Sequence, residues 1–295
     1  MSLSVLAIIV VSTFMHAGWN LMVRHGRSEP LFIRRMLIAG TVLGLGPVLI
    51  WEVLDPLGPR VWMLVCGSGT CCAIYFAGLA KAYSASDFTI VYPVARALPV
   101  LLVGVADVFL DRWPTPLGWM GMALVVVGCM LTPLTTLRSF HVRAYWNRAS
   151  LWIGLAALAT VGYSLVDKVG AEVLRETFSA GPVAPMRYGV IFFSIATIVY
   201  ELFIRLAGVP LTSSPPAGWT LPALAAVLNT VSYGLIVWAL QLTEQVSYVV
   251  AFRQFSIVIG VVAAMIIFRE PGRTVRFIAA LVITAGLVVI GVWGQ

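Results

Sequence analysis

The feature that most constrains this chain is a series of apolar runs, each close to the roughly 20 residues that an α-helix needs to cross a bilayer. They follow one another along the whole sequence with short polar gaps between them. Only 11% of the 295 residues are charged, whereas soluble domains have roughly 25%, and the mean hydropathy is +0.98. Because a water-soluble fold cannot bury so much apolar surface, the sequence predicts an all-α integral membrane protein.

The apolar runs, bounded at charges and at Pro and Gly clusters, predict ten transmembrane helices. The expected helices are residues 2–23, 31–51, 61–82, 88–110, 116–135, 150–167, 186–206, 219–241, 246–268 and 274–293. The first run lacks a basic start and a small-residue cleavage site, so we expect a helix there and not a signal peptide. The four cysteines lie inside apolar runs without metal-ligand spacing, which indicates small packing residues and no metal site.

Two sequence motifs occur in the same order in each half of the chain. GWNLMVRHG at 18–26 aligns with GYSLVDKVG at 162–170. VYPVARALP at 91–99 aligns with VVAFRQFS near 249–256, and this second match sets an arginine of one half against an arginine of the other. The motifs therefore predict that the chain contains an internal repeat.

A repeat of five helices has an odd number of crossings, so its second copy enters the membrane in the opposite orientation. We expect two inverted five-helix repeats, at residues 1–137 and 150–295, with a joining loop at 138–149, in one structural domain. The basic residues predict the orientation. Of 19 Lys and Arg residues, 12 fall in the gaps after helices 1, 3, 5, 7 and 9, and five, including Lys168 and Arg187, fall in the other gaps. The positive-inside rule then places both termini outside.

Arg96 and Arg253 lie inside predicted helices 4 and 9. A charge at the bilayer centre costs at least roughly 2.5–3.5 kcal/mol, so each arginine calls for a physical reason. A guanidinium can bind a carboxylate, phosphate or phosphonate of a substrate, or it can brace the protein by hydrogen bonds to helix ends and carbonyls. The sequence leaves both readings open. Pro93 and Pro99 flank Arg96 and predict a kink, which serves either the substrate or packing alone.

Other polar residues lie at positions that can face the same interior space. His16 and Asn20 are one turn apart on helix 1; such a histidine is usually a packing residue, and the alternative is substrate contact or proton coupling. The residues expected to face a central cavity are His16, Trp19, Asn20, Tyr92, Arg96, Tyr163, Ser164, Asn229, Tyr233 and Arg253.

The sequence motifs argue against two functional classes, an enzyme and an ATP-driven pump. Gly67-Ser68-Gly69 lacks the G-x-S-x-G frame of serine hydrolases, so no enzyme is predicted. The chain has no phosphate-binding loop, which excludes an ATP-driven pump formed by this chain alone.

With these features in place, the chain resembles the EamA-type ten-helix members of the drug/metabolite transporter superfamily. The resemblance is carried by PVLLVGVADVFLDRWP at Pro99–Pro114, the small-residue stretch Gly118–Leu131 and IIFREPGR at Ile266–Arg273. HAGWN at His16–Asn20 and YPVAR at Tyr92–Arg96 resemble a branch of uncharacterised carriers, some of them associated with phosphonate use.

The resemblance implies alternating access around a cavity lined by helices 1, 3, 4, 6, 8 and 9, without a prosthetic group. Related exporters of cationic drugs carry a buried acid in helix 1, and this helix has none. We therefore expect a secondary transporter of a small anionic or zwitterionic organic metabolite, such as an amino acid or phosphonate, in the inner (cytoplasmic) membrane of the cell. Its partners would be this substrate and membrane lipid, with no nucleic acid. A flippase for a lipid-linked sugar or polyprenyl phosphate, and a membrane scaffold or receptor that transports nothing, stay as alternatives.

Overall fold

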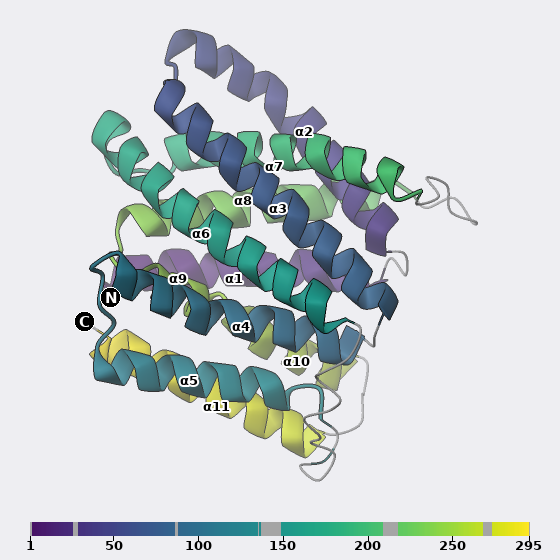
Figure 1. Cartoon of the computed structure of the whole chain (residues 1–295), viewed down its shortest axis with the longest axis vertical. Helices are drawn as coiled ribbons and strands as arrows, with labels where there is room; N and C mark the ends of the chain where they lie inside the picture. Colours follow the sequence, from purple (N-terminus) through teal and green to yellow (C-terminus); the bar gives the residue numbers. More distant parts are fainter. Residues whose placement is uncertain are drawn as a thin grey trace.

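A computed structural model describes residues 2–25, 29–85, 88–134, 136, 149–208, 218–267 and 273–294, and every regular element in these ranges is an α-helix (Figure 1). The helices are α1 (Leu3–His25), α2 (Glu29–Leu54), α3 (Pro59–Ala85), α4 (Phe88–Phe109), α5 (Pro116–Leu131), α6 (Ser150–Phe178), α7 (Val183–Leu206), α8 (Thr220–Gln241), α9 (Val246–Phe252), α10 (Phe255–Ile267) and α11 (Arg273–Trp293). Helix α1 begins and α11 ends at the same end of the bundle. The predicted joining loop at 138–149 falls outside the described residues except for its last residue.

Most of the described helices coincide with the runs expected from the sequence. Eight segments of the described chain are long and apolar enough to cross a membrane, and α5 is a shorter apolar helix. The expected helix at 246–268 is interrupted, because α9 and α10 are separated at Arg253 and Gln254. The reason for this break lies in the polar site described below.

Helix α6 differs most from the expectation, since it continues 11 residues beyond the predicted end at 167, to Phe178. The predicted end rested on two charged residues, Asp167 and Lys168, which were expected to leave the membrane. In the structure both are buried, with 2% and 4% of their surface exposed. The long connection expected after helix 6 is therefore wrong, and only residues 179–182 separate α6 from α7.

The two halves of the chain pack against each other through pairs of helices: α1 on α8, α3 on α6, α2 on α7 and α5 on α11. The pair α5 and α11 lies along one edge of the bundle (Figure 1). Its approach is close, since a Cβ atom added to Gly286 of α11 would lie 2.6 Å from the carbonyl oxygen of Gly121 of α5. Small residues thus set the distance between these two helices.

Two ion pairs join α2 and α7 near their opposite ends. Arg34, near the start of α2, contacts Glu201, near the end of α7, at 2.6 Å. Arg187, near the start of α7, contacts Glu52, near the end of α2, at 3.0 Å. An acid of the partner helix thus neutralises each of these two arginines inside its helix.

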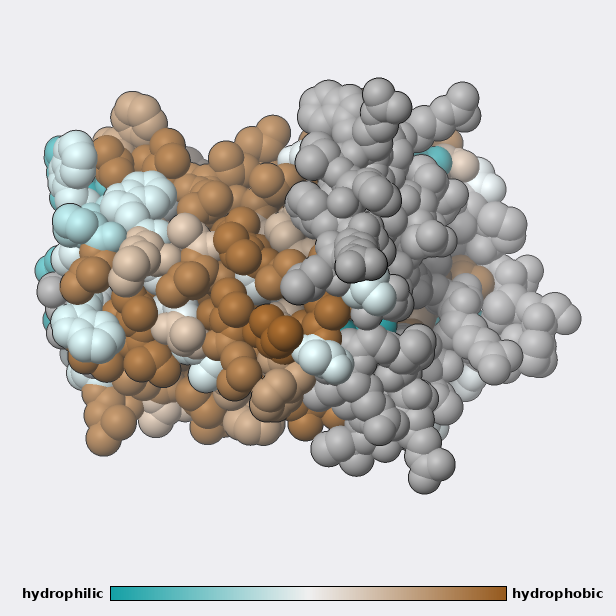
Figure 2. Space-filling model, turned by 90° about the horizontal axis from the view of Figure 1, so that it is seen from below, coloured by the Kyte–Doolittle hydropathy of each residue, from teal (hydrophilic) through white to brown (hydrophobic). Residues whose placement is uncertain are grey.

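The outer surface of the bundle is apolar. Figure 2 shows brown, hydrophobic side chains over most of the described surface of one face, with hydrophilic colours gathered toward one end. Helix α2 alone exposes large side chains that include Val42, Ile50 and Val53, at 74%, 67% and 85%. A surface of this kind is stable in lipid and not in water, so the chain is a multi-pass membrane protein.

Candidate functional site

Arg96 in the middle of α4 connects three helices and is only 8% exposed. Its Nη1 lies 3.0 Å from Nε2 of His16 on α1, and its Nε donates to Oε1 of Gln254 at 3.1 Å. Its Nη2 donates to Oγ of Ser256 at 3.2 Å and lies 3.4 Å from the carbonyl oxygen of Arg253. These four partners are neutral groups, and they come from α1, from α10 and from the break between α9 and α10.

The same contacts account for the break between α9 and α10. The backbone at the break forms tight turns, since the amide of Gln254 donates to the carbonyl of Ala251 at 2.9 Å and a helical bond is lost. The carbonyl of Arg253 accepts from Oγ of Ser256 at 2.8 Å and faces Arg96. A buried carbonyl must keep a hydrogen-bond partner; the carbonyl of Arg253 also accepts from the backbone amide of Ser256 at 3.2 Å, so this irregular backbone at membrane depth is fully satisfied inside the protein.

A pocket opens beside this break, with about 270 Å³ of empty space including its mouth. Its lining combines two arginines with aromatic and small polar side chains from α3, α4, α6 and the α9–α10 break. The lining residues are Tyr75, Ala95, Arg96, Pro99, Thr160, Tyr163, Val250, Arg253 and Gln254. Helices of both halves of the chain therefore contribute to one cavity.

Arg253 is placed differently from Arg96, although the two align in sequence. It is half-buried, and its guanidinium carbon lies 5.9 Å from the centre of the Tyr233 ring. Within the described part of the chain its guanidinium has no hydrogen bond or ion pair, although it attracts Asp167 electrostatically. Arg253 is thus a cation of the pocket lining whose position differs from that of Arg96.

Asp167 of α6 is a buried acid that the sequence analysis missed. Its Oδ1 accepts hydrogen bonds from Oγ of Ser68 and, at 2.9 Å, from the hydroxyl of Tyr188. Its Oδ2 accepts from the hydroxyl of Tyr233, the residue whose ring lies under Arg253. The carboxylate therefore ties α3, α7 and α8 to α6. In the sequence, the Asp-Lys pair of GYSLVDKVG lies between apolar residues. This pair was interpreted as the end of a helix, so the acid was overlooked.

His16, Trp19 and Asn20 of α1 lie together but do not line the pocket. The indole Nε1 of Trp19 is 3.1 Å from Nδ1 of His16, while Arg96 faces the other ring nitrogen. A neutral imidazole has one donor and one acceptor nitrogen, so only one of these two donors can be hydrogen-bonded to the ring. Asn20 is satisfied within its own helix, since its Nδ2 donates to the His16 carbonyl at 2.7 Å.

The remaining expected residues are spread around the pocket. Tyr163 lines it, and its ring packs edge-on against Tyr233, with centroids 6.3 Å apart. Ser164 and Asn229 are buried outside the lining, and the Ser164 hydroxyl has no hydrogen-bond partner in the described ranges. Tyr92 lies in α4, which is continuous through both flanking prolines, but its side chain falls outside the described part of the structure.

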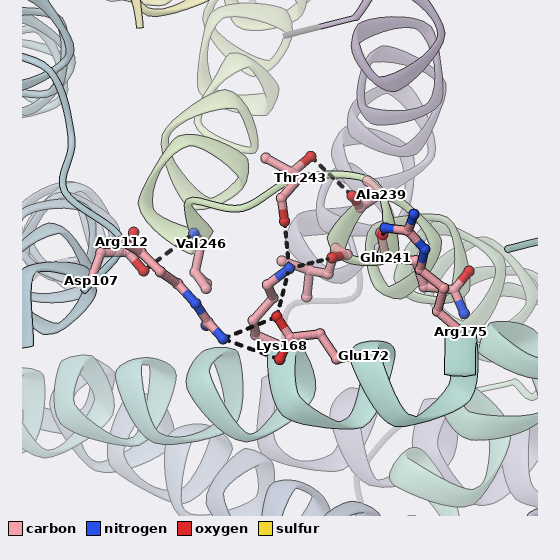
Figure 3. A network of polar contacts seen from close by, with 10 residues as sticks. Asp107, Arg112, Lys168, Glu172, Arg175, Ala239, Gln241, Thr243 and Val246 are labelled. Atoms are coloured by element: carbon pink, nitrogen blue, oxygen red, sulfur yellow. Dashed lines mark hydrogen bonds and ion pairs between the residues drawn. The ribbon is translucent and has the colours of Figure 1, made fainter. Parts of the chain in front are cut away.

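A second polar cluster lies at the end of the bundle where α8 ends and α9 begins (Figure 3). Lys168 Nζ donates to the carbonyls of Leu240, at 2.9 Å, and Thr243, which places a cation at the C-terminal end of α8. Lys168 also contacts Glu172 at 3.1 Å, and Glu172 accepts from Arg112 at 3.0 Å. Lys168 was expected in a gap between helices, and these carbonyls explain why it is buried inside α6 instead.

Asp107, near the end of α4, completes this cluster on the other side. Its carboxylate accepts from the backbone amides of Val246 and Ser247 at 3.3 and 2.8 Å, so it caps the N-terminus of α9. The short connection between α8 and α9 is therefore held by charged side chains from both halves. Among the described residues no group of three or more His, Cys, Asp or Glu side chains could hold a metal ion.

The first part of the sequence matches the model of a known protein family. Residues 3–133 match the EamA-like transporter family. The matched segment contains α1 to α5, including His16 and Arg96, and the resemblance inferred from the motifs is confirmed there. EamA-like proteins are membrane transporters, which agrees with the apolar helices. No curated protein matches the sequence.

The fold of the whole chain is also found among solved structures. One crystal structure matches with a TM-score of 0.77 and 15% sequence identity, over 100% of this chain and 98% of the other. It is one of 28 matching chains, so this arrangement of helices recurs. At such low identity the match describes the fold alone.

Proposed function

We propose that the protein is a secondary transporter that moves a small anionic or zwitterionic organic metabolite, such as an amino acid or a phosphonate, across the cytoplasmic membrane by alternating access. The observation that carries the proposal is the position of Arg253. Its guanidinium lines the pocket without an ion-pair partner among the described residues, whereas Arg96 beside it is held by neutral groups. This half-buried guanidinium can offer its hydrogen-bond donors to a bound carboxylate, phosphate or phosphonate, which would accept charge-assisted hydrogen bonds from it.

In this proposal the protein has ten transmembrane helices in two inverted repeats, and α9 and α10 together form the ninth helix. Exchange of the two halves turns the pair α1–α8 into α6–α3, and both pairs are packed. The same exchange turns the pair Arg34–Glu201 into an Arg187–Glu52 pair, which is also formed. These correspondences support repeats at 1–137 and 150–295, joined by 138–149; the distribution of basic residues separately favours both termini outside.

Alternating access fits the way the pocket is assembled. Its lining comes from α3 and α4 of the first half and from α6 and the α9–α10 break of the second. A rocking movement of one half against the other would open such a site to either side of the membrane. The α9–α10 break supports this further, because interrupted helices commonly form the substrate sites of secondary transporters.

Uptake into proteoliposomes tests the proposal with the purified full-length protein. We expect counterflow of at least one radiolabelled anion from a panel of carboxylates, amino acids and phosphonates. Arg253→Gln should reduce the initial rate at least tenfold, since a charge-assisted hydrogen bond is about twice as strong as a neutral one. Arg253→Lys keeps the charge but loses the planar fork, so it should raise KM more than it lowers the maximal rate.

The control is Arg60→Gln, which removes a charge from an exposed position. This variant should transport at the wild-type rate. If Arg253→Gln elutes as a monodisperse, folded protein and transports the same anion at the wild-type rate, the anion site is wrong.

The alternative, a flippase for a lipid-linked sugar or polyprenyl phosphate, also uses a cation inside the membrane. It predicts that no soluble anion exchanges, while a fluorescent polyprenyl phosphate changes leaflet in the same vesicles.

A further inference from the structure

The pocket contains positive charge and no accessible negative charge. Its charged lining residues are two arginines, and no Asp or Glu belongs to the described lining. A zwitterion such as an amino acid brings an ammonium group, which carries three donors and no acceptor. Such a group needs strong acceptors wherever water has been removed.

Asp167 is the acid that could serve an ammonium, but its oxygens are already engaged. They accept hydroxyls from Ser68, Tyr188 and Tyr233, and the residue is 2% exposed. An ammonium in the pocket could reach Asp167 only if the side chains that cover this carboxylate moved. The ring of Tyr233, whose hydroxyl donates to Asp167, is itself covered by Arg253.

The neutral groups of the lining offer little more to an ammonium. The amide of Gln254 is occupied at both ends, since Oε1 accepts from Arg96 and Nε2 donates to the Val250 carbonyl at 2.9 Å. The other side-chain oxygens of the described lining are the hydroxyls of Tyr75, Thr160 and Tyr163. Neutral hydroxyls bind a cation less strongly than a carboxylate does.

On these grounds we propose that the pocket selects a plain organic anion, a carboxylate, phosphonate or sulfonate without an ammonium group, and discriminates against the corresponding zwitterion. This inference rests on the proposed transport function and narrows its substrate class. Arg253 binds the anionic group, Arg96 adds positive potential while remaining bonded to its neutral partners, and the aromatic and small residues contact the rest of the molecule. An ammonium would be repelled by both guanidinium groups in a space of low dielectric constant.

Isosteric ligand pairs test the selection, because a methyl group and an ammonium group are similar in size. Propylphosphonate is compared with 2-aminoethylphosphonate, and isobutyrate with alanine, by calorimetric titration of the full-length protein in detergent micelles and by inhibition of counterflow. We expect the ligand without the ammonium to bind at least tenfold more tightly in one or both pairs. Arg253→Gln should abolish that binding.

A designed variant provides a second readout that does not depend on absolute affinity. Thr160 lines the pocket and is 8% exposed, so Thr160→Asp introduces the carboxylate that the pocket lacks. The ratio of the two affinities within a pair should shift at least tenfold toward the zwitterion. Thr160→Asn is the matched uncharged control and should leave the ratio near its wild-type value.

The outcomes separate this inference from the proposed function. Equal or tighter binding of 2-aminoethylphosphonate and alanine would overturn the selection against ammonium, while transport of an anion would stand. If none of the four probes binds or inhibits, and no anion in the counterflow panel exchanges, the transport proposal fails as well. Displacement of bound propylphosphonate by a much lower concentration of polyprenyl phosphate would overturn the soluble substrate in favour of a lipid headgroup.

Discussion

Replacing Asp167 by alanine removes the acceptor that three buried hydroxyl groups share. The Ser68 hydroxyl has an alternative, since the carbonyl of Tyr163 lies 3.5 Å away. The Tyr188 hydroxyl can turn to the Ser68 hydroxyl, whereas the Tyr233 hydroxyl has no other hydrogen-bond partner among the described residues. An unsatisfied buried hydroxyl costs about 1–3 kcal/mol, so the loss of one or two partners gives about 1–6 kcal/mol of destabilisation. This is a large share of the roughly 5–15 kcal/mol that keeps a typical protein folded.

A double-mutant cycle isolates the hydrogen bond from other effects of the substitution. Tyr188→Phe alone removes one bond to a charged group and should cost about 1.5–3 kcal/mol. In the Asp167→Ala background the same change removes a hydroxyl that has lost its charged acceptor, so it should cost little or stabilise the protein. The coupling energy should therefore be about 1.5–3 kcal/mol, well above the about 0.3–0.5 kcal/mol scatter of independent sites.

The measurement is reversible unfolding by SDS, followed by the fluorescence of the ten tryptophans. Tyr200→Phe is the matched control, because Tyr200 is 1% exposed and its hydroxyl has no hydrogen-bond partner within the described ranges. It should leave stability unchanged or slightly raised. Additive effects of Asp167→Ala and Tyr188→Phe, within about 0.5 kcal/mol, would show that the carboxylate does not hold this tyrosine.

Three further changes test how the helices are joined. Arg187→Ala leaves Glu52 without its cation in a mostly buried setting, and should destabilise the protein by about 3–5 kcal/mol in the same SDS titration; a loss below about 1 kcal/mol would mean a solvated surface pair. Gly286→Ala places a Cβ atom 2.6 Å from the backbone of α5 and should cost about 1–3 kcal/mol, whereas Gly67→Ala, with nothing within 4 Å, should be neutral; equal effects would contradict close packing of α5 on α11. Asp107→Ala removes the cap of α9 and should cost about 0.5–2 kcal/mol, with faster amide hydrogen exchange at the start of α9; unchanged exchange there would rule out capping.

The sequence predicted the existence of the helices better than their ends. Apolar runs are a local property, and transfer of each side chain into lipid adds along the chain, so nine of the ten expected helices appear as single helices in the described residues. The predicted helix ends were wrong where a charged residue had been taken to mark the end. Lys168 was expected to lie in a solvated gap between helices. In the structure its ammonium group donates to two backbone carbonyls, at the end of α8 and just after it, and contacts the acid Glu172.

The candidate site was predicted in part. The sequence placed Arg96 and Arg253 at matching positions and left open whether each braces the protein or binds an anion. Both line one pocket, along with the expected Tyr163. His16 contacts Arg96 without lining the pocket, and Tyr233 lies beneath Arg253. The sequence did not show that the two arginines differ.

Composition and periodicity alone thus determined a membrane-embedded helical chain with two intramembrane arginines, because solvation by lipid is decided residue by residue. Only the tertiary structure decided what each charge does. Arg96 is bonded to a histidine 80 residues away and to the α9–α10 break 158 and 160 residues away, whereas Arg253 lines the pocket over the ring of Tyr233. Asp167 likewise finds its hydroxyls on three other helices. The stabilisation of a buried charge depends on hydrogen-bond and ion-pair partners that the fold brings together from distant segments, and no local sequence pattern encodes these partners.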